Sequence, residues 1–303
     1  MSILALAAVA AACPQQSVVL DKLADVIEAR YANVHDGSVI AEQVREWNAD
    51  ARYAADCANA NMFLERLNRD LDAYDGHFHV ERAAAADGED WLLAWRRDAK
   101  SVNSGVREVG VLEGNVGYLR ISSFYPWDIA RAKYLAAWTL LSDAKGLIID
   151  LRQNGGGDAV TATHLVRSAL AETASVQSID RRGNLTREVL PAAELPALPD
   201  NLPIVLLVDR RSASASEYVA YSLQQAKRAK VVGSRSAGAA SLMGSPVPLH
   251  DGFQVIIPEA RPANIVSGRS WEGSGVVPDV RGGDDPLFVA RQLIANGAST
   301  ADR

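Results

Sequence analysis

The chain has 303 residues, of which 48% are hydrophobic and 22% are charged, and this composition is ordinary for a folded globular protein. Its formal net charge is -6 with acidic and basic residues interspersed, so no nucleic-acid partner is expected. No apolar run approaches the ~20 residues of a membrane-spanning helix, and no integral membrane span is expected. The length suits one large domain or two modest ones.

The N-terminal residues 1–16 form a possible signal segment. The stretch MSILALAAVAAAC is apolar and ends in small residues, although no Lys or Arg precedes it. Export to the periplasm or envelope is therefore predicted, with a cytoplasmic location as the alternative. Cys13 follows three alanines, so a lipoprotein signal is a further option. Since two cysteines do not make a disulfide framework, Cys57 is expected to be a buried free thiol.

Residues 17–75 are predicted to form a small N-terminal helical bundle. Apolar residues recur there in three stretches at the three- and four-residue spacing of amphipathic helices. We interpret these stripes as core rather than as functional sites. Their members are Val19, Leu23, Ile27 and Tyr31, then Val39, Ile40, Val44 and Trp47, and finally Phe63, Leu67, Leu71 and Tyr74.

Residues 76–303 are predicted to form a separate α/β core. Short apolar runs there alternate with amphipathic stretches, which favours an α/β domain with at least part of its sheet parallel. The expected strands lie at 116–121, 147–151, 204–208 and 231–232, and the expected helices at 128–144, 159–170 and 215–229.

The segment Ser212-Ala-Ser-Ala-Ser-Glu217 follows the predicted strand at 204–208 and opens a predicted helix. A serine at such a junction can present its hydroxyl at the edge of the sheet. The N-terminus of the helix offers free N–H groups and a partial positive charge, which can stabilise an oxyanion. The alternative is structural, because Ser214 and Glu217 also have the spacing of a capping box.

A run of glycines follows the predicted strand at 147–151, in the sequence Asn154-Gly-Gly-Gly-Asp158. Glycines allow a backbone to approach a ligand closely and to present its N–H groups. A phosphate-binding loop is the rival interpretation, but the spacing of the common nucleotide motifs is absent. A plain structural turn is a third.

Two further segments carry candidate chemistry. Asp75-Gly-His-Phe-His79 supplies histidines, and His77 is a candidate general base. In a strand, His77 and His79 would point to the same side. A purely structural role for the two histidines is the alternative to a catalytic one. Glu272 adds a carboxylate beside Trp271, where a solvated glutamate is the alternative. No Cys/His cluster has metal-ligand spacing, so neither a metal nor a cofactor is expected.

Taken in order, these motifs resemble the tail-specific, or C-terminal processing, protease family. Relatives of that family include the tricorn protease core and the repeats of the interphotoreceptor retinoid-binding protein. The resemblance covers roughly residues 75–281. It rests on a histidine after Asp-Gly, a strand before Asp-Leu-Arg-x-Asn-Gly-Gly, a strand before Ser-Ala-Ser-Glu, Val-Val-Gly, and Glu-Gly-x-Gly-Val-x-Pro-Asp.

The resemblance implies a crotonase/Clp-protease-like spiral of β-β-α units preceded by the helical bundle. It places the nucleophile at Ser214. The lysine base of the bacterial branch falls on Ala239, so a serine–lysine mechanism is not expected. The tricorn-like branch uses a histidine and a glutamate, which fall on His77 and Glu272. The oxyanion hole would be built from backbone N–H groups, those of Ala215 and of Gly155 or Gly156.

The function implied is that of a serine endopeptidase acting on peptide or unfolded-protein substrates without a metal or cofactor. The stretch between His79 and the strand at 116 is too short for the PDZ domain that many relatives carry. A non-catalytic protein that binds peptides or lipophilic ligands on the same fold is the main alternative, and acyl-coenzyme A chemistry is a third. Some family members assemble, so a homo-oligomer is compatible with the resemblance.

Overall fold

The computed structural model describes residues 14–83, 91–170, 177–187 and 193–301, so most of the candidate signal segment, up to residue 13, lies outside it. The chain divides into two compact units, which are described separately. The first comprises 1–87, 179–184 and 241–261, and the second comprises 88–178, 185–240 and 262–303. Among the described residues, no helix is both long and apolar enough to cross a membrane.

The first unit begins with the three predicted helices. They are α1 (Pro14–Arg30), α2 (Val34–Ala49) and α3 (Ala60–Asp72), with a 3₁₀ turn at Ala54–Asp56. Asn33 and Asn59 cap α2 and α3, because each side chain accepts hydrogen bonds from two backbone N–H groups of the first turn. The three helices place their apolar stripes in one core.

Three predictions about side chains in the first unit are wrong. Val39 is exposed because it precedes Ile40 by one residue and so lies on a different face of α2. Tyr74 is exposed because α3 ends at Asp72. Cys57 is exposed and disulfide-bonded rather than a buried free thiol. The other cysteine of the chain, Cys13, lies outside the described residues.

One small sheet accompanies the helices, and a second small sheet has strands whose residues fall in both units. Strands β1 (His79–Arg82), β11 (Phe253–Ile256) and β10 (Val247–Pro248) form an antiparallel sheet in the order β1-β11-β10. Phe253 and Val255 of β11 belong to the same core as the helices. The second sheet has the order β6-β5-β12-β9, with strands at Leu185–Arg187, Gln177–Asp180, Pro258–Ala263 and Leu242–Met243.

The second unit is built on a six-stranded sheet in the order β13-β8-β7-β4-β3-β2. The strands from β3 to β13 are parallel, and β2 is an antiparallel edge strand. Their bounds are Val280–Arg281, Lys230–Gly233, Ile204–Val208, Gly146–Asp150, Val116–Ile121 and Val106–Leu112, in the same order. The prediction of an α/β fold with a partly parallel sheet and an N-terminal helical region is confirmed.

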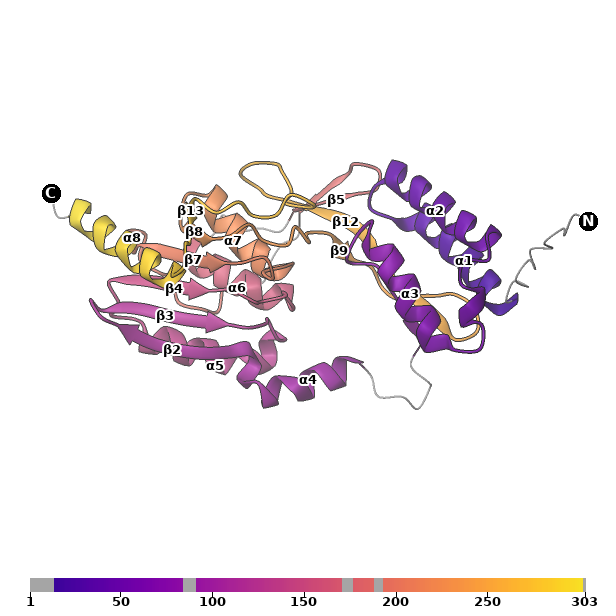
Figure 1. Cartoon of the computed structure of the whole chain (residues 1–303). Coiled ribbons are helices and arrows are strands. Elements are labelled where there is room, and N and C mark those ends of the chain that lie inside the picture. Colours follow the sequence, from indigo (N-terminus) through magenta and orange to yellow (C-terminus); the bar gives the residue numbers. More distant parts are fainter. Residues whose placement is uncertain (1–13, 84–90, 171–176, 188–192, 302–303) are drawn as a thin grey trace, which may run out of the picture. The chain divides into compact units, whose positions relative to one another are not determined.

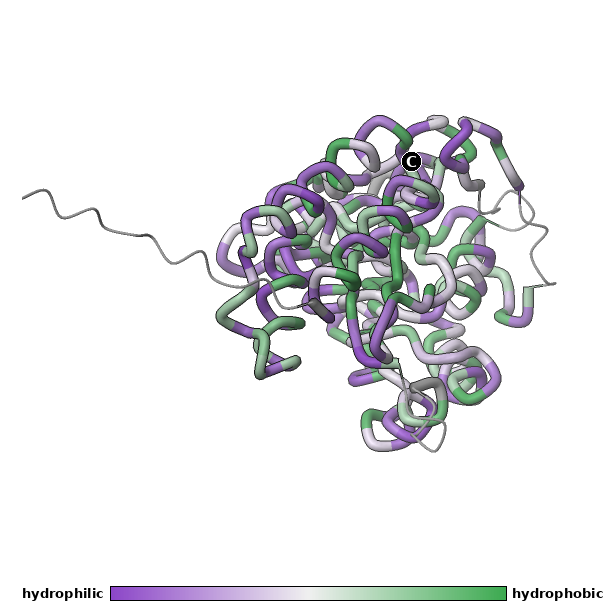
Figure 2. The backbone as a smooth tube through the Cα atoms, turned by 90° about the vertical axis from the view of Figure 1, so that its right-hand side faces the viewer, coloured by the Kyte–Doolittle hydropathy of each residue, from purple (hydrophilic) through white to green (hydrophobic). Residues whose placement is uncertain are grey.

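Helices cover both faces of this sheet (Figure 1). Side chains such as Ile149 and Leu206 face α5, α6 and α7, whereas Ile148 and Leu207 face α8. Strands buried on both faces are continuous apolar runs in the sequence, as in β4 and β7, all of whose residues are buried. Figure 2 shows hydrophobic and hydrophilic stretches alternating along the backbone. The helices of the unit are α4 (Trp91–Ser101), α5 (Trp127–Leu140), α6 (Ala159–Leu170), α7 (Ala215–Gln225) and α8 (Pro286–Ala301), with a 3₁₀ turn at Asn103–Gly105.

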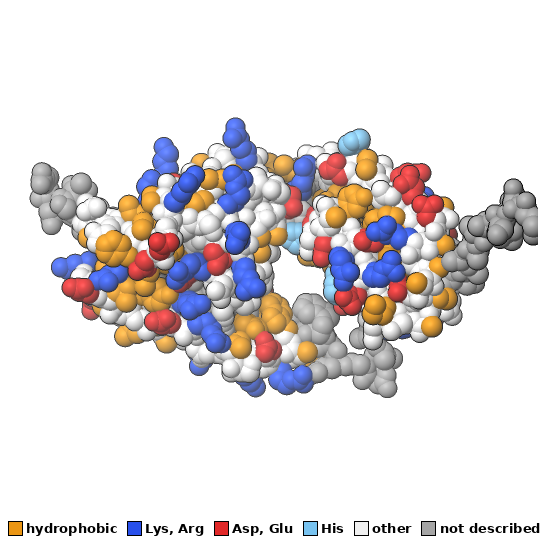
Figure 3. Space-filling model, viewed as in Figure 1, with side chains coloured by type: hydrophobic (Ala, Val, Ile, Leu, Met, Phe, Trp, Pro, Cys, Tyr) orange, Lys and Arg blue, Asp and Glu red, His pale blue; other side chains and the backbone are white. Residues whose placement is uncertain are grey.

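Helix α7 ends four residues before the predicted limit of 229. Lys227 has a positive φ of 56°, which breaks the helical path. The guanidinium of Arg228 then donates to the carbonyls of Ala169, Pro199 and Leu202. Arg228 therefore holds these segments in place instead of extending the helix. On the face shown in Figure 3, acidic and basic side chains are interspersed.

Candidate active site

Ser214 lies at the turn between β7 and α7, in the second unit. It is the N-cap residue of α7 and has φ 54° and ψ -120°, a strained backbone for a residue with a Cβ. Its N–H donates to the carbonyl of Ala239 and to the carboxylate of Glu217, both at 3.0 Å. These bonds hold a half-buried serine on a sharp strand-to-helix turn, a geometry typical of an exposed nucleophile.

The neighbouring serines have structural roles. Ser212 is fully buried, and its hydroxyl donates to the carbonyl of Leu151. Ser216 is also fully buried, and its hydroxyl donates to the carbonyl of Asn154. Among the described residues, the hydroxyl of Ser214 donates no hydrogen bond, whereas those of Ser212 and Ser216 both donate to backbone carbonyls.

The glycine turn that follows β4 packs directly against Ser214. Gly156 has φ 106°, and a Cβ placed on it would lie 2.7 Å from the Cβ of Ser214. The turn is held by the buried side chain of Asn154, which donates to the carbonyl of Ile121 and accepts the N–H of Gly156 at 2.8 Å. Glycine is therefore required at 156 by both its conformation and its neighbour.

The candidate oxyanion donors differ in their surroundings. The N–H of Gly156 is already bonded to Asn154, whereas Gly155 is exposed and has open space around its Cα. Ala215 is the first residue of α7, where the N–H group has no partner inside the helix. Of the two glycines, Gly155 is thus the one whose N–H group has no hydrogen-bond acceptor among the described residues.

Glu217 is a buried carboxylate that organises the turn. It accepts hydrogen bonds from the N–H groups of Ser214, Gly238 and Ala239 and from the hydroxyl of Ser236. Burial raises the pKa of Glu217 above its ordinary value, although these donors oppose the shift. The sequence assigned Glu217 only to a helix cap, but its carboxylate also connects the turn at Ser214 to the loop at 236–239.

Ala239, where the resemblance places a lysine, lies beside Ser214. Its carbonyl accepts the N–H of Ser214 and its own N–H donates to Glu217, so it acts through its backbone alone. Residues 231–303 contain no lysine.

Glu272 approaches the same loop from the segment after β12. Its carboxylate accepts the N–H of Ala240 at 2.7 Å, and the N–H of Gly273 donates to the carbonyl of Gly238. The neighbouring Trp271 is buried, with its ring 5.2 Å from that of Tyr221. The second unit therefore assembles Ser214, the glycine turn and Glu272 around one loop.

His77 belongs to the first unit, in the turn between α3 and β1. Its Nδ1 lies 2.8 Å from Oδ1 of Asp75, and its backbone N–H donates to the same oxygen at 2.9 Å. Because His77 precedes the strand, it does not share a face with His79: its side chain is 12% exposed, against 56% for His79.

Asp75 is a functional candidate that the sequence reasoning missed. Burial alone would raise its pKa, but hydrogen bonds from His77 and Tyr31 outweigh burial and hold the pKa of this carboxyl below its ordinary value. The available signal was the Asp-Gly-His sequence itself, since an aspartate often bonds the backbone two residues later.

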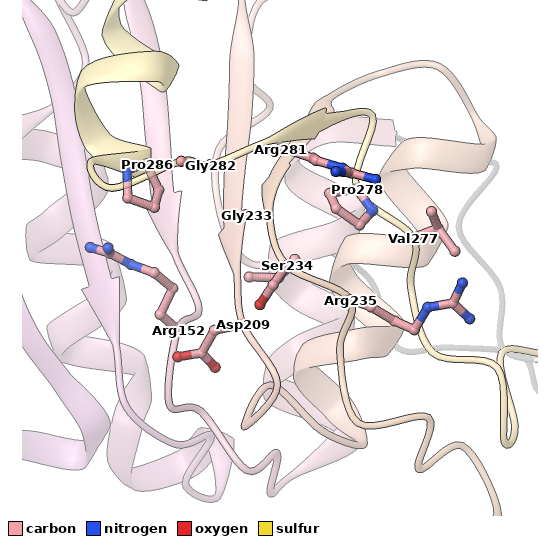
Figure 4. Close-up of a pocket in the computed structure, with 12 residues that line it drawn as sticks. Arg152, Asp209, Gly233, Ser234, Arg235, Val277, Pro278, Arg281, Gly282 and Pro286 are labelled. Carbon is pink, nitrogen blue, oxygen red and sulfur yellow. The ribbon is translucent and has the colours of Figure 1, made fainter.

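A pocket of about 450 Å³ opens at the carboxyl ends of β4, β7 and β8 (Figure 4). Three arginines line it, but Arg152 points to one side and Arg235 and Arg281 to the other. Arg152 is bonded to Asp150, and Arg235 donates to the carbonyl of Ser274. The arginines therefore do not converge on a common anion.

The chain belongs to peptidase family S41, which it matches over residues 115–281. It is 32% identical over 174 residues to a carboxy-terminal-processing protease of Bartonella bacilliformis, covering 56% of this chain and 39% of that protein. It is also 32% identical over 174 residues to a chloroplastic C-terminal processing peptidase of Tetradesmus obliquus, covering 57% and 36%. The chain thus spans well under half the length of these relatives.

Two solved structures share the fold over nearly their whole length. One is a putative peptidase from Parabacteroides merdae, with a TM-score of 0.64, 19% identity, and coverage of 92% of this chain and 96% of that one. The other is a lipoprotein from Streptococcus agalactiae, with a TM-score of 0.63, 17% identity, and coverage of 98% and 99%. The tricorn protease is also similar, with a TM-score of 0.57, 14% identity, and coverage of 94% and 37%.

Proposed function

We propose that this protein is a serine peptidase that cleaves peptide bonds through an acyl-enzyme on Ser214, with His77 as general base and Glu272 as the third member of the set. The observation that carries the proposal is the state of Ser214. It is a half-buried serine with a strained backbone, its hydroxyl donates no hydrogen bond among the described residues, and it stands at a helix N-terminus against a glycine turn. Membership in the S41 family supports the same chemistry.

In the first step, His77 takes the proton of the Ser214 hydroxyl as its oxygen attacks the peptide carbonyl. The negative charge that develops on the carbonyl oxygen is stabilised by the N–H groups of Ala215 and of Gly155, since that of Gly156 is bonded to Asn154. One such donor is worth about 3 kcal/mol in the transition state.

Collapse of this intermediate breaks the C–N bond, and His77 returns the proton to the leaving amine. Water then attacks the acyl-enzyme ester, with His77 again accepting a proton and passing it to Ser214. Glu272 stabilises the charged form of His77, directly or through an intermediary. The proposal requires His77 of the first unit to meet Ser214 of the second.

The substrate proposed is an extended peptide or an unfolded protein segment. Ala239 leaves no lysine to act as base, so histidine is the proposed base. The exported location predicted from residues 1–16, and assembly into a homo-oligomer, remain predictions.

The test is labelling with a fluorophosphonate and hydrolysis of a fluorogenic peptide library. Ser214→Ala is expected to abolish labelling and to lower kcat/KM on the order of a million-fold. The exposed Ser234→Ala serves as the matched control and should keep both. His77→Ala should lose activity to a similar extent, whereas His79→Ala, an exposed histidine two residues away, should retain it. Full activity of Ser214→Ala would refute the proposal.

A further inference from the structure

Resting on the proposed function, we infer that Asp75 is a positioning residue of the active site. It fixes the orientation and the tautomer of the His77 ring, and Tyr31 holds Asp75 in place. Asp75, two residues before the histidine, thus takes part of the role that the proposed function gives to Glu272.

The contacts of Asp75 divide between its two oxygens. Oδ1 faces the Nδ1 atom of His77 at 2.8 Å and accepts the backbone N–H of the same residue at 2.9 Å. Oδ2 accepts the hydroxyl of Tyr31 at 3.0 Å. The Asp75 side chain is 3% exposed, so these bonds form away from water.

This arrangement determines which ring nitrogen carries the proton. An ionised carboxylate can only accept hydrogen bonds, so Nδ1 of a neutral His77 must carry the hydrogen. The lone pair then lies on Nε2, the nitrogen that would accept the proton of the serine hydroxyl in the proposed reaction. When His77 becomes charged, the same carboxylate stabilises the imidazolium.

The carboxylate is itself held by packing. Tyr31, which follows the last residue of α1, stacks on Phe78 with ring centroids 5.3 Å apart and planes at 15°. Both aromatic residues are buried in the core of the first unit. Because Phe78 adjoins His77 in sequence, one aromatic stack fixes both the tyrosine hydroxyl and the histidine turn.

The direct test is ¹⁵N NMR of the histidine rings in the full-length wild-type protein, with the His77 signals assigned by comparison with His77→Ala. The expected result is a neutral His77 with hydrogen on Nδ1 and not on Nε2. The opposite tautomer would overturn the inference, and this measurement needs no Asp75 variant to fold.

The kinetic test compares Asp75→Asn with Glu272→Gln. Asp75→Asn should lower kcat by about 10³- to 10⁴-fold with little change in KM, because an amide in place of the carboxylate permits the wrong tautomer. Loss of the neighbouring negative charge should also shift the acid limb of the kcat/KM profile to lower pH. Tyr31→Phe keeps the carboxylate and should lose less than about tenfold.

The outcomes separate this inference from the proposed function. If His77→Ala remains active, the proposed function fails, whatever the tautomer. If His77→Ala is inactive but Asp75→Asn keeps activity within about threefold and leaves the tautomer and the acid limb unchanged, the role of Asp75 is refuted. If only Glu272→Gln alters the tautomer, Glu272 is the positioning residue and the inference is equally refuted.

Discussion

The two adjacent glycines at 155 and 156 offer a sharp test of the packing around Ser214. Gly156 has φ 106°, and an added Cβ would lie 2.7 Å from the Ser214 Cβ and 2.9 Å from the carbonyl oxygen of Ala213. Gly155 is exposed, has no positive φ, and has nothing within 4 Å of an added Cβ. The added methyl group of alanine would therefore overlap other atoms at position 156 but not at position 155.

The cost of Gly156→Ala follows from two terms. The strained conformation contributes about 1–3 kcal/mol. The overlap with Ser214 and Ala213 contributes about 1–3 kcal/mol more, because backbone atoms must move. We therefore expect a loss of about 2–6 kcal/mol in the free energy of unfolding. Gly155→Ala should change it by less than about 1 kcal/mol.

The assay is urea unfolding followed by tryptophan fluorescence, with both variants measured beside the wild type. Fluorophosphonate labelling of Gly156→Ala should also slow by at least about 100-fold, since a shift of the serine turn by ~1 Å misplaces the nucleophile. Equal stability of the two variants would refute the packing argument. Labelling of Gly156→Ala at the wild-type rate would show that the turn tolerates the added methyl group.

Two further predictions concern buried titratable groups. Glu217→Gln should lower the free energy of unfolding by about 1–3 kcal/mol and slow labelling of Ser214, because an amide NH₂ replaces an oxygen that accepts hydrogen bonds from surrounding donors. The control is Glu113→Gln, at a side chain that is 91% exposed. Equal stability of the two variants would contradict the role given to Glu217. Burial lowers the pKa of His164, so the unfolded chain binds more protons than the folded one below about pH 6.5. Stability should fall as the pH drops below that value, by up to about 1.4 kcal/mol per pH unit, and the loss should be smaller in His164→Asn. Urea titrations at pH 7 and pH 5 measure this difference, and parallel losses in both proteins would exclude His164 as the cause.

The parts of the fold that could be predicted were those set by local pattern. The strand at 116–121 and the helix at 159–170 were predicted with the bounds observed, since the first is a short apolar run and the second an amphipathic stretch. The end of α7 was missed because Arg228 is recruited by carbonyls of residues distant in sequence. A tertiary contact of that kind leaves no mark on local periodicity.

The candidate site divides in the same way. In the sequence, only the motif distinguished Ser214 from the two neighbouring serines. The structure adds a physical difference, because the hydroxyls of both neighbours are buried and donate hydrogen bonds to backbone carbonyls. Asp75 was overlooked because an Asp-Gly pair is typical of an ordinary turn. Its importance depends on Tyr31, 44 residues earlier, which no local pattern connects to it.

The carboxylate of Glu217 has a consequence for how such sites can diverge. It fastens the backbone of Ser214 and of Ala239 without using the side chain at 239. The backbone position of Ser214 therefore does not depend on which side chain occupies position 239. A change of side chain at 239 therefore does not require the serine turn to be rebuilt, whether or not the new side chain takes part in proton transfer.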